Sequence, residues 1–323
     1  TGTDLEVELV GRVQLAGAGD SGEVTVPARK LVDICKSLPE GSDIQFAMQD
    51  NKVTVKSGRS RFTLSTLPSR EFPNVEDSLG THQFKVKQGQ LKRLIDRTAF
   101  AMAQQDVRYY LNGMLWELKG GQLRVVATDG HRLALCTLPE KLNADGDTQV
   151  ILPRKGVLEL ARLLLDEAAE AVVVIGRNHI RATTNDFTFT SKLVDGKFPD
   201  YQRVLPRAPD KIVVGSRLEL RQAFTRTAIL SNEKYRGVRL KLTDNSLDIV
   251  ANNPEQEEAE EAVPVRYEGD PLEVGFNVSY LLDVLGVLSG DEVKLSLSDP
   301  NSSALLEESE EGDSLYVVMP MRL

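Results

Sequence analysis

The sequence predicts an α+β fold made of three repeated units, in which two helices pack on antiparallel strands. Two observations support this. A short apolar strand followed by a helix start occurs three times, at Pro27, Pro153 and Asn277, with a spacing of about 125 residues. Each copy then leads into strands with alternating apolar and polar residues. At 323 residues, the chain is long enough for two or three domains.

The residue at each helix start suits its position. Proline has no N–H group to leave unpaired there, and asparagine can cap the first turn. Apolar residues then recur at helical spacing. The three copies span residues 24–38, 150–164 and 274–288.

The strands that follow are predicted to have one buried face, because their side chains alternate in polarity. In the first unit they are residues 43–48, 52–56 and 61–67. In the second unit they are residues 171–175, 179–183 and 187–193, and in the third they are residues 292–297, 302–307 and 314–319.

The other half of the unit occurs twice in full. Residues 91–104 and 218–230 are predicted amphipathic helices, followed by hairpins that turn at Gly120-Gly121 and at Asp244-Asn245. The stretch after the first hairpin contains Asp129, and Asp4 lies about 125 residues before it. We therefore expect the chain to begin in mid-unit and the natural protein to extend further at its N-terminus.

Domain boundaries follow from the repeat and from two related motifs that begin at Phe72-Pro and Phe198-Pro. The expected domains are residues 1–80, a first domain without its front part, residues 81–207, the central domain, and residues 208–323, the C-terminal domain.

Composition excludes several classes of protein. The chain has neither a run of 18 apolar residues nor an apolar signal region at its start, so we expect a soluble cytoplasmic protein with no membrane association. Cys35 and Cys136 have apolar neighbours and are predicted to be small buried hydrophobes. The three histidines show no metal-ligand spacing, so no metal or cofactor is expected.

The stretch from Ala127 to Leu135 is the strongest candidate for catalysis, because Asp129 and His131 flank a turn at Gly130. The corresponding residues in the third unit are Asn252-Asn-Pro, so the repeated architecture does not require acid/base groups there. The sequence has no nucleophile elbow, phosphate loop or dinucleotide fingerprint. We therefore expect no catalytic residues.

Basic residues recur on the predicted helices of successive units. Several are four or seven residues apart and so share a helix face. They form either ordinary solvated faces or one uneven stripe that faces a polyanion. The net charge of −9 does not decide between these alternatives. The residues are Arg29, Lys30, Lys36, Arg93, Arg97, Arg154, Lys155, Arg162, Arg217, Arg221 and Arg226.

Two charged segments are complementary. Lys52, Lys56, Arg59 and Arg61 lie in the first unit without an acidic residue between them, whereas residues 255–261 in the third unit include five glutamates. They are either two solvated surfaces or a head-to-tail contact between copies of the chain. In the second case, apolar Phe62, Ile229 and Leu230 would form the centre of the contact, with Glu257 and Glu260 beside them.

The three-fold repeat, the stretch from Ala127, the motif Arg108-Tyr-Tyr-Leu-Asn-Gly, the motif Ser231-Asn-Glu-Lys and the C-terminal segment from Tyr316 together resemble the bacterial DNA polymerase III beta subunit, the sliding clamp family. The resemblance covers the whole chain. It implies a head-to-tail homodimeric ring of six domains with helices lining the hole. Twelve helices spaced about 10 Å apart would enclose a hole of roughly 25 to 30 Å, wide enough for duplex DNA.

The resemblance also implies site residues. DNA-facing positions are Arg29, Gln105, Tyr109, Tyr110, Arg154 and Lys155, to which we add Arg162 from the basic helix face. A peptide-binding pocket would contain Thr128, Gly130, His131, Arg132, Leu133, Pro199, Arg203, Val204, Ser303, Val317, Met319, Pro320 and Met321. Its flexible apolar walls would suit short apolar peptide motifs.

The partners implied are double-stranded DNA without sequence preference, a second copy of the chain, the replicative polymerase alpha subunit, the clamp loader delta subunit, and translesion and repair polymerases. The subunit itself would be a non-catalytic processivity factor of the polymerase III holoenzyme. The alternatives are a hydrolase that depends on Asp129 or His131, and an interaction scaffold that does not bind DNA.

Overall fold

The computed structural model describes residues 1–15, 17, 19–73, 75, 80–144, 146–310 and 312–322. It forms two compact units. The first contains Thr1–Ser78 with Asn185–Thr190, and the second contains Leu79–Thr184 with Ser191–Leu323. The domain boundary expected at residue 80 lies next to Leu79, where the second unit begins. Leu79 and Leu323 themselves lie outside the described residues. Within the described residues, no helix is long and apolar enough to cross a membrane.

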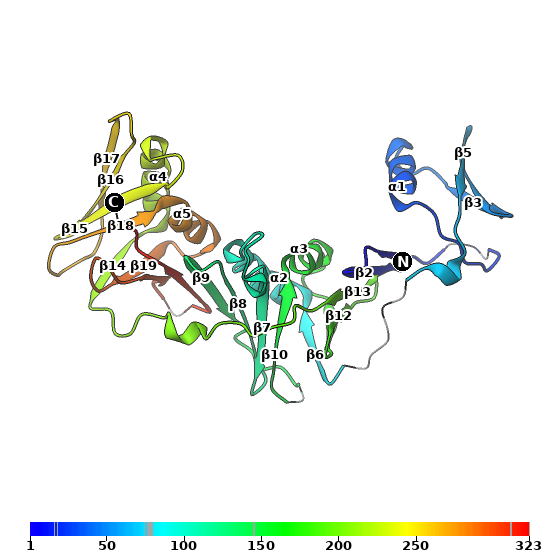
Figure 1. Cartoon of the computed structure of the whole chain (residues 1–323), viewed down its shortest axis with the longest axis horizontal. Helices are drawn as coiled ribbons and strands as arrows, with labels where there is room; N and C mark the ends of the chain where they lie inside the picture. The colour runs from blue at the N-terminus through cyan, green and yellow to red at the C-terminus, as the bar shows by residue number, and fades with distance from the viewer. Residues whose placement is uncertain are drawn as a thin grey trace. The chain divides into compact units, whose positions relative to one another are not determined.

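The first unit contains one α-helix among its described residues. Its core is small: Val53, Val55 and Leu64 on one face of a three-stranded sheet pack with Leu31 and Ile34 of the helix. Its elements, blue in Figure 1, are β1 (Gly2–Thr3), β2 (Val7–Gly11), α1 (Ala28–Ser37), β3 (Gln45–Gln49), β4 (Lys52–Ser57), β5 (Ser60–Ser65) and η1 (Ser69–Glu71).

The prediction that both cysteines are buried is wrong for Cys35. Cys136 is buried, but Cys35 is exposed on α1, a helix without any fully buried residue. In the second unit each helix packs against a second helix, α2 against α3 and α4 against α5. Among the described residues of the first unit α1 has no such neighbour. The apolar surroundings of Cys35 in the sequence therefore do not produce burial.

The second unit contains two copies of the predicted repeat. The central half comprises β6 (His82–Lys87), α2 (Gln88–Asp96), η2 (Ala99–Ala101), η3 (Tyr109–Leu111), β7 (Gly113–Lys119), β8 (Gln122–Thr128), β9 (Arg132–Thr137), β10 (Thr148–Pro153), α3 (Arg154–Leu163), β11 (Glu170–Ile175), β12 (His179–Thr183) and the end of β13 (Phe187–Lys192), a strand whose residues up to Thr190 belong to the first unit.

The C-terminal half repeats this order. It comprises η4 (Tyr201–Arg203), β14 (Lys211–Ser216), α4 (Arg217–Thr227), η5 (Ala228–Leu230), β15 (Gly237–Thr243), β16 (Ser246–Asn252), β17 (Glu258–Pro264), β18 (Leu272–Asn277), α5 (Val278–Val287), β19 (Glu292–Leu297), β20 (Ala304–Glu308) and β21 (Ser314–Val318). Among the described residues, each half therefore has the predicted two α-helices, and the predicted α+β class is confirmed.

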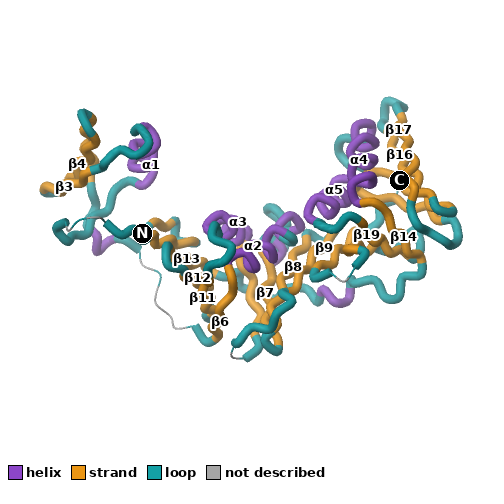
Figure 2. The backbone as a smooth tube through the Cα atoms, turned by 180° about the vertical axis from the view of Figure 1, so that it is seen from behind, coloured by secondary structure: helices purple, strands orange, loops and turns teal. Residues whose placement is uncertain are grey.

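One eight-stranded antiparallel sheet, in the order β10-β7-β8-β9-β21-β20-β19-β14, runs through both halves of the second unit. The halves join where β9 pairs with β21, with Leu133 opposite Val317 and Leu135 opposite Leu315. Strands β15 to β18 form a separate four-stranded sheet. The pairs α2–α3 and α4–α5 lie beside these sheets on the same side of the unit, as Figures 1 and 2 show.

The hairpin turns occur where they were predicted. Gly120 and Gly121 have φ values of 56° and 79°, and Asn245 has a φ of 55°. Residues with positive φ are those that two-residue hairpin turns need. The helix predicted for residues 91–104 is wrong in its length, because α2 ends at Asp96. Thr98, with a φ of −129°, leaves the helical conformation and its hydroxyl donates to the carbonyl of Leu94.

Candidate functional site

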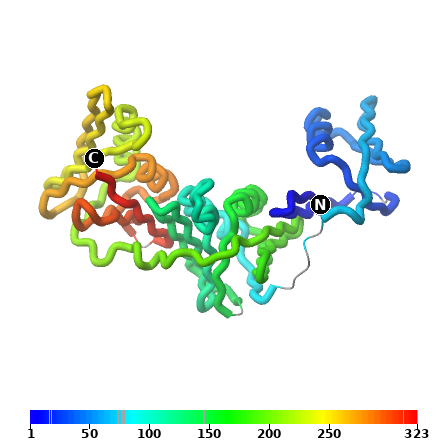
Figure 3. Tube along the Cα trace, viewed as in Figure 1, coloured from blue at the N-terminus to red at the C-terminus, as the bar shows by residue number. Residues whose placement is uncertain are grey.

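A largely apolar cavity of about 170 Å³ opens in the second unit beside the junction of β9 and β21. Its walls come from four segments: η3, the turn between β8 and β9, the linker between β13 and β14, and β21 with Met319 behind it. The linker, yellow-green in Figure 3, runs from the central half to the C-terminal half. Eight of the thirteen predicted pocket residues line the cavity: Thr128, Gly130, Arg132, Leu133, Pro199, Val204, Val317 and Met319.

The turn between β8 and β9 is held by hydrogen bonds of two of its own side chains. The Asp129 carboxylate accepts hydrogen bonds from the backbone N–H groups of His131 and Arg132, at 2.9 and 3.0 Å. The Thr128 hydroxyl accepts from the N–H of Gly130 and donates to the carbonyl of Arg132. Asp129 therefore shapes the turn, as aspartate does in such motifs. This arrangement does not orient His131 for acid/base chemistry.

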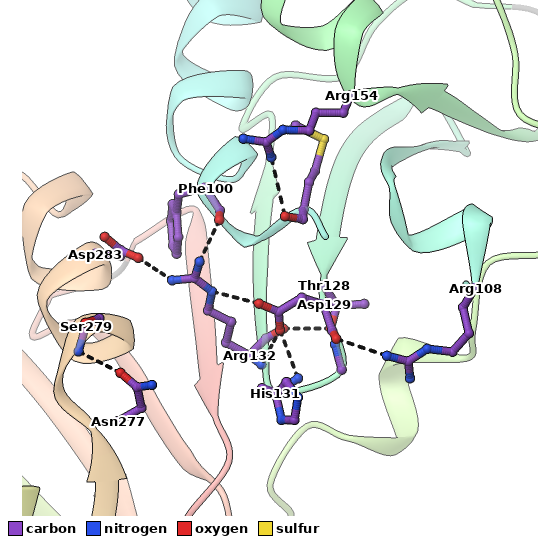
Figure 4. A network of polar contacts seen from close by, with 12 residues as sticks. Phe100, Arg108, Thr128, Asp129, His131, Arg132, Arg154, Asn277, Ser279 and Asp283 are labelled. Carbon is purple, nitrogen blue, oxygen red and sulfur yellow. Dashed lines mark hydrogen bonds and ion pairs between the residues drawn. The ribbon is translucent and has the colours of Figure 1, made fainter. Parts of the chain in front are cut away.

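Arg132 is one of the lining residues, and its guanidinium points toward Phe100 and Asp283 (Figure 4). It donates to the carbonyl of Phe100 at 2.9 Å and forms ion pairs with Asp129 and Asp283. Its central carbon lies 4.5 Å from the ring centroid of Tyr280, a cation–π distance. Arg132 was predicted to contact a peptide. The structure places it in the cavity lining and pairs its charged end with Asp283 of helix α5.

Arg108 is a cavity residue that was not predicted. Its guanidinium pairs with Asp106 and donates to the carbonyl of Asp129. The hydrogen bonds from Arg108 lower the pKa of Asp106 to about 2. A Cβ atom at Gly130 would lie 3.0 Å from this guanidinium, and Gly130 has a φ of 89°. Both facts explain why glycine occupies that position.

The other predicted pocket residues lie outside the cavity lining. Arg203 is exposed and pairs with Asp200 at 2.9 Å. Met321 donates its N–H to the carbonyl of Gly275 and lines a separate cavity with Tyr235. His131, Ser303 and Pro320 are also not part of the lining. The lining residues that sequence reasoning did not assign to the pocket are Arg108, Tyr110, Leu111, Asp200 and Tyr201. The first three belong to the motif Arg108-Tyr-Tyr-Leu-Asn-Gly, which carries part of the family resemblance.

The predicted DNA-facing residues fall in both units. Arg29 is exposed on α1 of the first unit. In the second unit, Gln105 and Tyr109 are exposed in the loop before β7, and Arg154, Lys155 and Arg162 lie on α3. Tyr110 differs from this group, because its ring packs against the apolar core and lines the cavity. The structure thus groups Tyr110 with the pocket.

The predicted basic stripe is wrong for two helix arginines. Arg97 is 6% exposed and donates to Glu308 and Ser289, at 3.0 and 2.7 Å. Arg217 donates to the carbonyls of Leu285 and Gly290 at the end of α5. Both side chains stabilise contacts between elements, because buried or half-buried guanidinium groups require partners inside the protein.

The residues predicted for a contact between copies lie on or near strands at sheet edges. In the first unit, Arg61 is exposed on edge strand β5, Arg59 is exposed in the preceding turn, and Phe62 is half-buried. In the second unit, Glu260 is exposed on edge strand β17, and Glu257, just before it, is held by Asn253. Ile229 is 75% exposed in η5 and Leu230 is half-buried.

Comparison with family models identifies all three parts of the chain. Residues 1–76, 85–200 and 202–322 match the N-terminal, central and C-terminal domains of the DNA polymerase III beta subunit. The beta sliding clamp of Pseudomonas aeruginosa is 66% identical over 323 residues, which is 100% of this chain and 88% of the relative. The beta sliding clamp of Escherichia coli K12 is 55% identical, with the same coverage.

Solved structures agree with the sequence comparisons. A sliding clamp of P. aeruginosa bound to griselimycin has a TM-score of 0.97 at 66% identity, covering 100% of this chain and 87% of that one. A sliding clamp of Bartonella birtlesii, also bound to griselimycin, has a TM-score of 0.92 at 38% identity, covering 99% of this chain and 87% of that one. The chain belongs to the DNA polymerase III beta subunit family, the beta sliding clamps.

Proposed function

We propose that this protein is a sliding clamp that encircles duplex DNA and tethers the replicative polymerase to it. The observation that carries the proposal is the preformed apolar cavity, lined by eight residues predicted from the family resemblance, in a chain that matches clamps over its full length. The clamp is a processivity subunit and not an enzyme. Its contribution is topological, because a closed ring stays on DNA without a tight grip.

The cavity is the docking site for short apolar segments of partner proteins. Leu133, Val204, Val317 and Met319 give it adaptable walls that suit several related sequences. The replicative polymerase alpha subunit, the clamp loader delta subunit, and translesion and repair polymerases would compete for it. Of the residues outside the lining, His131 lies between two lining residues in the sequence and Met321 lies two residues after Met319, and both would contact the part of a peptide that leaves the cavity.

Duplex DNA is contacted through its phosphates. Arg29, Gln105, Tyr109, Arg154, Lys155 and Arg162 offer cationic or polar side chains on exposed or half-buried positions. Contacts to phosphates fix position without reading sequence, so the ring can slide. This distribution also accommodates a net charge of −9, since only the DNA-facing surface has to be basic.

The ring consists of two copies joined head to tail, each with domains at residues 1–80, 81–207 and 208–323. In the described part of a single chain, strands β5 and β17 each have one unpaired edge, and their charges are opposite. Antiparallel edge pairing with Phe62, Ile229 and Leu230 at its centre would close the ring. Replication of the chromosome places such a clamp in the cytoplasm.

The test is retention on DNA of defined topology. A clamp loader loads the protein onto nicked circular DNA, and gel filtration separates the protein–DNA complex from free protein. In half of the sample, a restriction enzyme then cuts the DNA circle once. A clamp stays with the circle and is released from the linear DNA within minutes. Loss from the uncut circle at the same rate would disprove encirclement. A scaffold that does not bind DNA would be absent from both fractions.

A further inference from the structure

A row of polar side chains crosses four neighbouring strands of the eight-stranded sheet, β10, β7, β8 and β9. Gln149 of β10, Glu117 of β7, Arg124 of β8 and Thr137 of β9 are direct neighbours in the strand register. Directly opposed residues of antiparallel strands point to the same face. We call these four residues the polar row. The Arg124 guanidinium donates to the Thr137 hydroxyl at 3.0 Å, and the Gln149 amide donates to Glu117.

Two residues further along each strand, the same face is apolar. Leu115, Val126, Leu135 and Ile151 form a buried cluster there with Phe198 and Tyr201 of the linker. The linker is therefore held on the sheet by two aromatic rings. Phe198 contributes only apolar packing, whereas Tyr201 also carries a hydroxyl that needs a partner when buried.

The Tyr201 hydroxyl joins the linker to the polar row. It donates to the Glu117 carboxylate at 2.7 Å and accepts from the Arg124 guanidinium at 3.0 Å. Tyr201 is 5% exposed and Glu117 is 8% exposed, so water cannot easily replace these bonds. Glu117 also has Gln149 and Arg124 as partners. Glu117 therefore keeps partners within the polar row when Tyr201 is absent. Among the described hydrogen bonds, the linker is joined to the polar row only through the Tyr201 hydroxyl.

The anchored segment is a wall of the cavity. Pro199, Asp200, Tyr201 and Val204 all line it. The N–H of Val204 donates to the carbonyl of Tyr201 at 3.2 Å, so Val204 follows any movement of Tyr201. Val204 is 38% exposed and has little packing of its own to hold it.

We propose that Tyr201 is a positioning residue for the peptide cavity, because its hydroxyl fixes the Pro199–Val204 wall to the polar row and keeps the cavity open at the width that a ligand needs. This inference rests on the proposed function of the cavity. Without the anchor, the wall samples positions in which the cavity is closed or widened. The apparent dissociation constant then rises in inverse proportion to the fraction of molecules that are competent to bind.

The test compares Tyr201→Phe with the parent protein, using griselimycin as the probe in calorimetric titrations. The variant keeps the ring and loses only the two hydrogen bonds. We expect binding to weaken about five- to tenfold. The matched control is Tyr267→Phe, which removes a buried tyrosine hydroxyl that donates to the carbonyl of Asp270 in the C-terminal half. The control should lower the Tm without changing the affinity, since Tyr267 is not part of the cavity lining.

A double-mutant cycle adds a second measurement. Glu117→Gln alone should weaken binding, and its effect should be smaller in the Tyr201→Phe background, because the two residues act through one contact. Equal affinities of the parent and Tyr201→Phe would overturn the inference, and so would equal losses of affinity in Tyr201→Phe and Tyr267→Phe. A parent protein that does not bind griselimycin would instead overturn the proposed function of the cavity.

Discussion

Arg132 belongs to the cavity and to the protein interior at the same time. It is a lining residue, while its guanidinium lies over the rings of Phe100 and Tyr280 and pairs with Asp129 and Asp283. These partners come from three elements, namely η2, the turn before β9, and α5. One side chain therefore ties the cavity wall of the central half to a helix of the C-terminal half.

Replacing Arg132 by alanine should lower the free energy of unfolding by about 3 kcal/mol, because it leaves the half-buried Asp129 without its charged partner. Arg132→Lys should restore only part of this, since an ammonium group cannot make the same planar set of bonds. Urea denaturation measures both. The control is Arg203→Ala, whose side chain is 81% exposed. It should change the stability by less than about 0.5 kcal/mol, and equal losses in the two alanine variants would contradict this role of Arg132.

At the scale of single residues, the family resemblance supplied most cavity positions, because the stretches that carry it, such as Thr128 to Leu133, also contribute to the lining. Sequence reasoning could not find Tyr201, whose role depends on a register between β7 and β8 that only the folded sheet provides. It misjudged Arg97 for a related reason. Basic residues on one helix face have the same spacing in the sequence whether that face is exposed to solvent or packs against a strand.

At the scale of elements, the repeat predicted helices and strands well, because polarity alternation and turn residues are local signals. The exact ends of helices were less predictable, as α2 shows by ending at Asp96. A tertiary contact is formed at its end: Arg97, directly after α2, reaches Glu308 of β20 in the other half. Burial disfavours the charge of Glu308, but hydrogen bonds from Ser289 and Arg97 prevail, so the pKa of Glu308 is lowered.

The contact between α2 and β20 should make stability depend on pH. A carboxylate with a lowered pKa stabilises the fold above its unfolded pKa of about 4.3, and this contribution is lost as the pH falls through the folded pKa. Glu308→Gln should therefore reduce the free energy of unfolding by about 2 kcal/mol at pH 7, where Arg97 keeps a neutral partner in place of a charged one. The difference should shrink below about pH 4.

The control for Glu308→Gln is Glu273→Gln. Glu273 pairs with Arg239 at 3.1 Å, and both side chains are largely exposed. Its loss should cost less than about 1 kcal/mol. Denaturation curves recorded between pH 3 and pH 7 compare the variants. A stability gap for Glu308→Gln that stays constant down to pH 3 would show that the charge of Glu308 is not what stabilises the contact.

At the scale of the whole molecule, the proposed ring depends on contact between edge strands of two copies. Replacing Glu257 and Glu260 by lysine places positive charges where Arg59 and Arg61 of another copy would approach. We expect dimers to dissociate at concentrations where the parent stays dimeric, and the effect to be larger at 50 mM than at 500 mM salt because salt screens exposed charges. Sedimentation velocity measures the species directly.

The control reverses two exposed charges elsewhere in the C-terminal half, at Glu233 and Glu268. It changes the net charge by the same amount but should leave the dimer intact. Identical sedimentation of the parent and the Glu257/Glu260 variant at low salt would argue against the proposed contact.

The pairing of β9 with β21 has a consequence for biosynthesis. β21 follows β9 only after the whole C-terminal half, yet it completes the sheet of the central half. While the protein is being translated, β9 emerges from the ribosome long before β21, and until then its outer edge has no partner strand. An open apolar edge of this kind invites pairing with other chains. Nascent clamps should therefore depend on chaperones until β21 has emerged.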